Sequence, residues 1–286
     1  MTSTVNLLST SKCFGGLVKR YSHYSECCAC EMKFHVFEPP AATSKPAVLL
    51  FLSGLTCNDE NFITKAGAIE YAYKNNLFLV CPDTSPRGCK IEGEDDSWDF
   101  GTGAGFYVDA TTEKWCKNYN MYSYISEELY NIVNKQFSVN VNKWSIFGHS
   151  MGGMGALVIA LRNPGKYQSV SAFAPISNPV DCQWGLKNFS NYLGTDDKSK
   201  WEQYDPSILA RNYKGSHIDI LVDQGTEDNF LEEQLKPQTL QDACEANPQH
   251  LALSLRKQEG YNHNYFFIST FIKDHIEFHA QHLNQQ

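Results

Sequence analysis

Short apolar runs alternate along the chain with longer segments in which apolar residues recur at helical spacing. Two of the runs, residues 47–54 and 77–82, are apolar almost throughout, which is typical of strands buried on both faces of a sheet. Similar runs predict further strands at 143–147, 169–176, 218–224 and 251–255. Helical spacing predicts helices at 61–75, 121–137, 151–161 and from about residue 264. This alternation predicts an α/β fold: a mostly parallel central sheet with helices on both faces and right-handed crossovers.

Two runs near the amino terminus differ from the others because their apolar residues partly alternate with polar ones. They span residues 13–21 and 32–37, and Pro39 and Pro40 close the second. This pattern favours an antiparallel pair at one edge of the sheet. At 286 residues, with no internal repeat and no linker, the chain is expected to form a single domain over residues 1–286.

The composition restricts the classes of partner. Apolar residues make up 42% of the chain and charged residues 20%, which is typical of a globular protein. The net charge of −8 argues against nucleic acid or an anionic membrane as the main partner. No apolar run approaches the roughly 18 residues that span a bilayer, and residues 1–8 lack the pattern of a secretory signal. We therefore expect a cytoplasmic protein.

Ten cysteines are many for this length, but too sparse for a disulfide scaffold. Cys27, Cys28 and Cys30 contain a C-x-x-C spacing, yet no second pair of ligands follows nearby as a zinc site would require. We interpret the three as free thiols in an early loop or strand edge, and we expect no metal site.

The strongest chemical motif lies between the predicted strand at 143–147 and the helix after it. Gly148-x-Ser150-x-Gly152 fits the G-x-S-x-G nucleophile elbow in the strand–turn–helix setting that the motif requires. The turn forces the serine into strained backbone angles, and a Cβ at either glycine would collide with a neighbouring element. Ser150 is therefore the candidate nucleophile, set over the amino end of a helix where a developing negative charge is favoured.

A serine nucleophile needs a base, and the base needs an acid that holds its tautomer. In this fold the acid and then the histidine follow the serine along the chain, each just past a strand. Beyond the Gly225 turn, Asp228 is the preferred acid and Glu227 the runner-up. His263 is the histidine that lies between the last predicted strand and the last helix.

Three other residues have the right chemistry for these roles but less suitable positions. Asp223 still lies within a strand pattern and could point into the sheet. His149 adjoins the serine, but neighbouring side chains around an elbow diverge, so a structural role is expected. His275 falls on the apolar stripe of the terminal helix, which favours a packed histidine.

The oxyanion hole of such a site combines two backbone N–H groups. One belongs to Met151, directly after the nucleophile. The other is expected from the loop after the strand at 47–52, where Gly54 permits a close approach and Leu55 is the chosen donor. Cys57 would then border the active site, although a buried structural thiol explains it equally well.

Longer stretches resemble one family along nearly the whole chain, from about residue 13 to residue 283. The matching stretches are 52–57 (LSGLTC), 86–89 (PRGC), 97–107 (SWDFGTGAGFY), 147–153 (FGHSMGG), 163–167 (NPGKY), 172–175 (AFAP) and 223–225 (DQG). On these residues the sequence resembles the S-formylglutathione hydrolase or esterase D family of the α/β-hydrolase superfamily. One departure is Met154, where the family usually has histidine, and this bears on local packing more than on the triad.

The resemblance implies an α/β-hydrolase fold, a cytosolic homodimer and hydrolysis of the thioester S-formylglutathione to glutathione and formate. It places the triad roles on Ser150, Asp228 and His263, and a thiol-sensitive cysteine at Cys57. No cofactor is expected.

The long irregular segment at 83–118 is typical of a functional loop. Its Gly101-x-Gly103-x-Gly105 pattern lacks the strand and helix of a dinucleotide site. We interpret the part from Trp98 to Tyr107 as a wall of the substrate pocket, with a packed structural lid as the equal alternative. Two functional alternatives also stay open: a general carboxylesterase for short acyl esters, which are expected substrates in any case, and a non-catalytic binding protein of the same fold.

Overall fold

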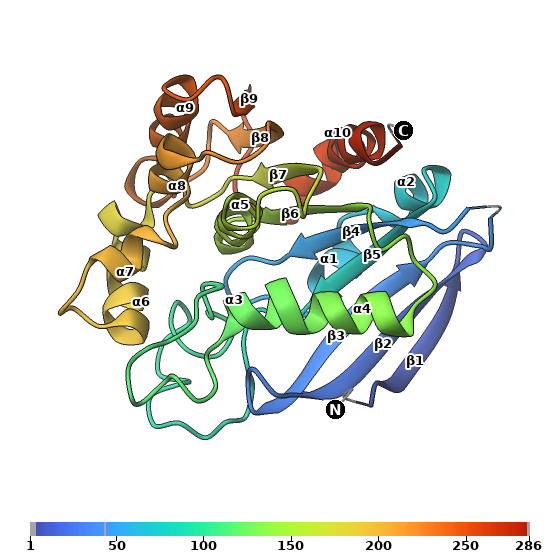
Figure 1. Ribbon diagram of the computed structural model, residues 1–286, viewed down its shortest axis with the longest axis horizontal. Coiled ribbons are helices and arrows are strands. Elements are labelled where there is room, and N and C mark those ends of the chain that lie inside the picture. The colour runs from blue at the N-terminus through green and yellow to red at the C-terminus, as the bar shows by residue number, and fades with distance from the viewer. Residues whose placement is uncertain (1–3, 43, 285–286) are drawn as a thin grey trace.

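The computed structural model describes residues 4–42 and 44–284, so the first three residues of the amino-terminal segment considered above lie outside the described residues. Nine strands form one sheet in the order β1-β2-β3-β5-β4-β6-β7-β8-β9 (Figure 1). The strands are β1 (Asn6–Cys13), β2 (Gly16–Ser25), β3 (Cys30–Glu38), β4 (Ala47–Leu52), β5 (Leu77–Pro82), β6 (Trp144–His149), β7 (Ser169–Phe173), β8 (Ile218–Gly225) and β9 (Leu251–Gln258). The six strands from β5 to β9 in this order are parallel, which confirms the predicted α/β arrangement.

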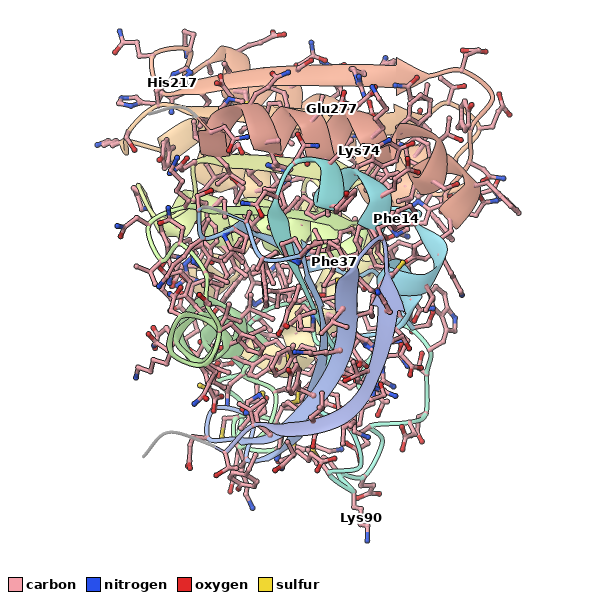
Figure 2. All side chains as sticks on the ribbon, turned by 90° about the vertical axis from the view of Figure 1, so that its right-hand side faces the viewer. Phe14, Phe37, Lys74, Lys90, His217 and Glu277 are labelled. Carbon is pink, nitrogen blue, oxygen red and sulfur yellow. The ribbon has the colours of Figure 1, made fainter. Side chains whose placement is uncertain are left out.

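The antiparallel amino-terminal edge is confirmed, but it contains three strands and not two. The predicted strand at 13–21 is wrong at its start, because Phe14 and Gly15 form a turn with positive φ angles of 47° and 77°. This turn joins β2 to β1, and such φ angles are those of a tight hairpin. Figure 2 shows Phe14 at the hairpin tip close to helix α2, where its ring stacks on Tyr73.

The helices cover both faces of the sheet. They are α1 (Asn61–Lys65), α2 (Ile69–Lys74), α3 (Met121–Ser123), α4 (Tyr130–Gln136), α5 (Met151–Arg162), α6 (Gln183–Leu193), α7 (Ser199–Glu202), α8 (Pro206–Asn212), α9 (Pro237–Glu245) and α10 (Tyr265–Asn284). Short turns complete them: the π-helical η1 (Tyr124–Leu129) and η3 (Leu231–Leu235), and the 3-10 helix η2 (Pro179–Asp181). The single helix predicted at 61–75 is divided into α1 and α2, because Gly67 adopts a left-handed φ of 69°.

Strand β7 shows how the two faces differ. Ser169 and Ser171 point toward α10, where they hydrogen-bond to histidines of that helix. Ala172 points the other way, toward α5. A Cβ added at Gly153 of α5 would lie 3.2 Å from the Cβ of Ala172. Helices α2 and α10 therefore share one face and α5 lies on the other, as Figure 1 shows.

One continuous apolar core runs on both sides of the sheet, with β4, β5 and β6 fully buried along their length. The long segment between β5 and α3 contains no helix or strand of its own among the described residues, as predicted. In Figure 2, Lys90 marks this segment at the end of the molecule away from α10. Within the described part of the chain, no helix is long and apolar enough to cross a membrane.

Candidate active site

The connection between β6 and α5 has the geometry of a nucleophile elbow. Ser150 adopts φ 57° and ψ −120°, a strained conformation for a residue with a side chain. Its N–H is held by the carbonyl of Phe173 at 2.9 Å. A Cβ at Gly148 would lie 2.2 Å from the carbonyl oxygen of Gly152, and one at Gly152 would lie 2.0 Å from that of Leu52. The elbow closes only because both positions are glycine.

The candidate acid and the candidate base meet across the ends of β8 and β9. Asp228 Oδ2 accepts a hydrogen bond from His263 Nδ1 at 2.6 Å. The other carboxylate oxygen accepts the backbone N–H of Phe230 at 2.9 Å, which fixes the carboxylate within a side chain that is fully buried. Because Nδ1 donates to the carboxylate, Nε2 of the neutral imidazole is left as the acceptor that a serine proton requires.

The predicted residues face one small cavity of about 150 Å³. Its wall contains Ser150 and His263 together with Leu55, Cys57 and Trp98, which were expected there, and also Gly54, His149, Trp184 and Phe230. The described residues form no direct hydrogen bond between Ser150 and His263. Such contacts commonly tighten only when a substrate is bound, so the shared cavity is the relevant observation.

The loop after β4 brings backbone N–H groups to the same place. The N–H groups of Thr56 and Cys57 bond to the carbonyls of Gly103 and Gly54. Among the described residues, the N–H groups of Leu55 and Met151 pair with no carbonyl or side chain. A Cβ at Gly54 would lie 3.1 Å from Ser150 Cβ, which shows how closely this loop approaches the elbow. Both candidate oxyanion donors are therefore available beside the serine.

His149 lies closer to the site than its expected divergence from Ser150 suggested. Its ring is 4.5 Å from that of His263, centroid to centroid, and neither ring nitrogen forms an ordinary hydrogen bond. Burial, together with the neighbouring His263, holds the pKa of His149 well below its usual value. The ring is therefore a neutral packing surface for the candidate base.

Cys57 also lines the cavity. Burial raises the pKa of its thiol, against the lowering effects of Tyr265, Lys65 and Arg87. The side chain thus stays protonated at neutral pH. Arg87 also donates to the Cys57 carbonyl at 3.0 Å, which ties this part of the wall to the long loop.

The remaining candidates lie outside the cavity. Asp223 is buried in β8, and Arg256 and His275 bind its carboxylate. Glu227 is exposed at the turn after β8. Met154 is buried on α5, where its N–H bonds to the carbonyl of Ser150.

Sequence reasoning missed two aromatic residues of the wall. Trp184 lies on α6 and contacts both Trp98 and Phe230 edge-on or at a tilt. Phe230 follows Asp228 by two residues, and its ring meets that of His263. Proximity to the acid could have pointed to Phe230, whereas no sequence motif marks Trp184.

The described residues contain no group of three or more histidine, cysteine or acidic side chains that could hold a metal ion. Cys27, Cys28 and Cys30 surround the turn between β2 and β3. Burial raises the pKa of Cys27 to about 12, and it raises that of Cys28 as well. Neither thiol is therefore poised as a thiolate.

Comparison with known proteins agrees with this geometry. Residues 25–278 match the esterase family described as "Putative esterase". The chain is 56% identical to S-formylglutathione hydrolase of Bos taurus, over 97% of this chain and 98% of the relative. It is 52% identical to the enzyme of that name from Arabidopsis thaliana, over 99% of both chains. A solved S-formylglutathione hydrolase from Agrobacterium tumefaciens superposes with a TM-score of 0.93 at 42% identity, over 98% of this chain and all of that one.

Proposed function

The chain belongs to the esterase family of the S-formylglutathione hydrolases, and from this premise we propose that it hydrolyses S-formylglutathione to glutathione and formate, completing glutathione-dependent removal of formaldehyde. The observation that carries the proposal is the cavity shared by Ser150 and His263, with Asp228 bonded behind the imidazole.

The reaction proceeds by acyl transfer in two steps. His263 Nε2 takes the proton of Ser150 as Oγ attacks the formyl carbon. The N–H groups of Leu55 and Met151 hold the oxyanion of the tetrahedral intermediate. Collapse of this intermediate breaks the C–S bond, and the proton on His263 passes to the departing sulfur, which leaves as glutathione.

Water completes the cycle. His263 removes a proton from water as the oxygen attacks the formyl-serine ester, and the same two N–H groups hold the second oxyanion. Ser150 regains its proton from His263 as formate leaves. Asp228 stays ionised throughout and stabilises the imidazolium that forms in each step.

The size of the cavity supports a small acyl group. Its volume of about 150 Å³ is below the range of about 300–1,000 Å³ that is usual for pockets enclosing a drug-sized ligand. Trp98 lines the cavity and is also exposed to solvent. The peptide part of the thiol would lie on this exposed aromatic ring, outside the small acyl site.

Steady-state kinetics test the substrate. We expect kcat/KM for S-formylglutathione to exceed that for an acetyl aryl ester, while the short ester is still hydrolysed. A preference for the ester by orders of magnitude would instead make the protein a general carboxylesterase.

We extend the proposal to the assembly, the compartment and the domain organisation. A homodimer is supported by strand β1, an edge strand whose side chains are nearly all exposed, among them Leu7 and Leu8. A cytoplasmic location is supported by ten cysteines that are all free. A single domain is supported by one sheet that receives strands from both ends of the chain. Light scattering after gel filtration would test the dimer directly.

A further inference from the structure

A second and larger cavity, of about 510 Å³, is lined by Gln224, whose side chain also bonds to the candidate acid Asp228. It is lined by the end of β8, by η3, by the start of α9 and by β9. Figure 1 shows β8, β9 and α9 close together at the top of the view. Its volume falls within the range of sites for small molecules.

One short stretch of chain separates this cavity from the candidate active site. Phe230 lines the cavity that contains Ser150 and His263, whereas the next residue, Leu231, lines the larger one. Asp228 lies two residues before Phe230 and accepts a hydrogen bond from the backbone N–H of Phe230. A ligand in the larger cavity would therefore press on the segment that holds the acid.

Gln224 connects the larger cavity to Asp228. In β8 it pairs with Lys257 of β9, and cross-strand partners project from the same face of a sheet. Lys257 lines the cavity, so the Gln224 side chain faces it too. Its Nε2 donates to the carbonyl of Gly225 at 3.1 Å and to Asp228 Oδ2 at 3.4 Å.

The other amide atom of Gln224 has no partner. Both neighbours of Nε2 are acceptors, so the amide cannot be turned over without losing its bonds, and Oε1 remains an acceptor. This oxygen is buried and unpaired, in a residue that is 1% exposed. A buried acceptor without a donor is costly, and a shift of the side chain into the cavity that Gln224 lines would let a ligand N–H satisfy it.

The rim of the cavity carries one available charge of each sign. Among the described residues, Lys257 and Glu232 are exposed and form no ion pair, whereas Lys236 is bound to Asp181. A carboxylate matches Lys257, an ammonium matches Glu232, and an amide N–H matches Gln224.

We propose that this cavity is a second binding site for a zwitterionic small peptide, and that its occupancy acts on Asp228 through Gln224. A donor on Oε1 polarises the amide and strengthens the long bond from Nε2 to the carboxylate. Glutathione is the peptide of this class that the protein meets, a choice that rests on the proposed function.

Calorimetric titration of glutathione into protein whose Ser150 carries a fluorophosphonate adduct tests the site, because the adduct fills the other cavity. We expect saturable binding at one site per chain, and about tenfold weaker binding after Lys257→Glu or Gln224→Leu. Lys12→Glu, on the distant strand β1, should bind glutathione as the wild type does. Glutarate, which has the carboxylates without the ammonium, should not bind.

Absent saturation, or binding that neither Lys257→Glu nor Gln224→Leu weakens, would overturn the inference. Failure of Ser150 to label would count against the proposed function instead, and the same titration on Ser150→Ala would still decide whether the cavity binds. In the active enzyme, millimolar glutathione should change kcat for a saturating acetyl ester, and Lys257→Glu should abolish that change.

Discussion

The part of the chain that the structure describes contains two Ser–His–Asp arrangements, of which the first faces a cavity and the second does not. In the first, Ser150 and His263 share the small cavity and Asp228 bonds to His263. In the second, Ser171 bonds to His275 Nδ1 at 2.8 Å, and His275 Nε2 lies 3.1 Å from Asp223 Oδ2. The second set is fully buried between β7, β8 and α10.

The carboxylates of the two sets differ in their partners. Asp228 bonds to one imidazole, one backbone N–H and the weak donor Gln224. Asp223 receives two bonds from the guanidinium of Arg256, both 2.6 Å long. Although burial raises the pKa of Asp223, His275 and Arg256 hold it at about 2. Its charge is thus already neutralised, and little is left to stabilise an imidazolium.

The serines differ even more. Ser150 is held in a strained turn beside two unpaired N–H groups. Ser171 lies in a regular strand, and its hydroxyl also meets His279 Nε2 at 2.7 Å. The hydrogen bonds continue from His279 to Ser169 and Ser145. Every hydroxyl and imidazole nitrogen in this series of hydrogen bonds therefore has a partner. The three residue types alone therefore do not make a nucleophile: space, a free acceptor nitrogen and oxyanion donors do.

The largest expected difference between the sets is in turnover. Ser150→Ala should lower kcat for S-formylglutathione by about 10⁶-fold, since the nucleophile is removed. Ser171→Ala should leave kcat unchanged but lower the free energy of unfolding by about 1–3 kcal/mol, because two imidazole nitrogens lose their partner. Steady-state assays and urea unfolding check the pair; a large loss of turnover in stably folded Ser171→Ala would contradict the distinction.

The two carboxylates should separate in the same manner. Asp228→Asn should lower kcat by about 10⁴-fold, because the amide favours the wrong tautomer of His263. Asp223→Asn should instead reduce the free energy of unfolding by about 2 kcal/mol, through lost bonds to Arg256 and His275. The comparison fails if Asp228→Asn retains wild-type turnover.

A smaller effect is expected where the loop after β4 meets the elbow. Gly54→Ala would place a Cβ 3.1 Å from Ser150 Cβ and 3.2 Å from His149 Nδ1. The added Cβ should displace the N–H of Leu55, and this displacement should lower kcat by about 10²-fold. Gly165→Ala is a control away from the site: no atom lies within 4 Å of the added Cβ, but the φ of 80° disfavours alanine, so this variant should lose stability and keep its turnover. Equal turnover in the two variants would remove Leu55 from the oxyanion hole.

The smallest effect is a dependence of stability on pH, to which the buried set contributes through His275 and its neighbour His279. Burial lowers the pKa of His275, against Asp223, and lowers that of His279 well below 6.5. As the pH falls, the two histidines take up protons in the unfolded chain before they do so in the folded protein. Their contribution to the free energy of unfolding is therefore fully present above about pH 6.5 and is lost as the pH falls below that value. We expect a loss of about 1–2 kcal/mol between about pH 7.5 and about pH 5.5.

Urea unfolding at the two pH values measures this loss. His279→Gln should make the dependence less steep without abolishing it, because His275 and His149 also have lowered pKa values. His217→Gln, at an exposed position, should leave the dependence unchanged. A dependence equally steep in His279→Gln would assign the protons elsewhere.

The sequence predicts the parallel sheet, the long loop and the elbow because each depends on local patterns of residues. The preference for Asp228 over Asp223 also rests on a local pattern, the strand that continues to Gly225. The hairpin at Phe14 and the break at Gly67 were missed, since both depend on single residues with positive φ angles. The set of Ser171, His275 and Asp223 was out of reach, because its members fit ordinary strand and helix patterns and meet only through tertiary packing.

The central claim is that Ser150 is the nucleophile of this chain. Peptide mapping by mass spectrometry after treatment with a fluorophosphonate tests it most directly. The account predicts one adduct per chain, on Ser150, and none on Ser171 or in the Ser150→Ala variant. An adduct on another residue, or folded protein that does not react, would contradict it.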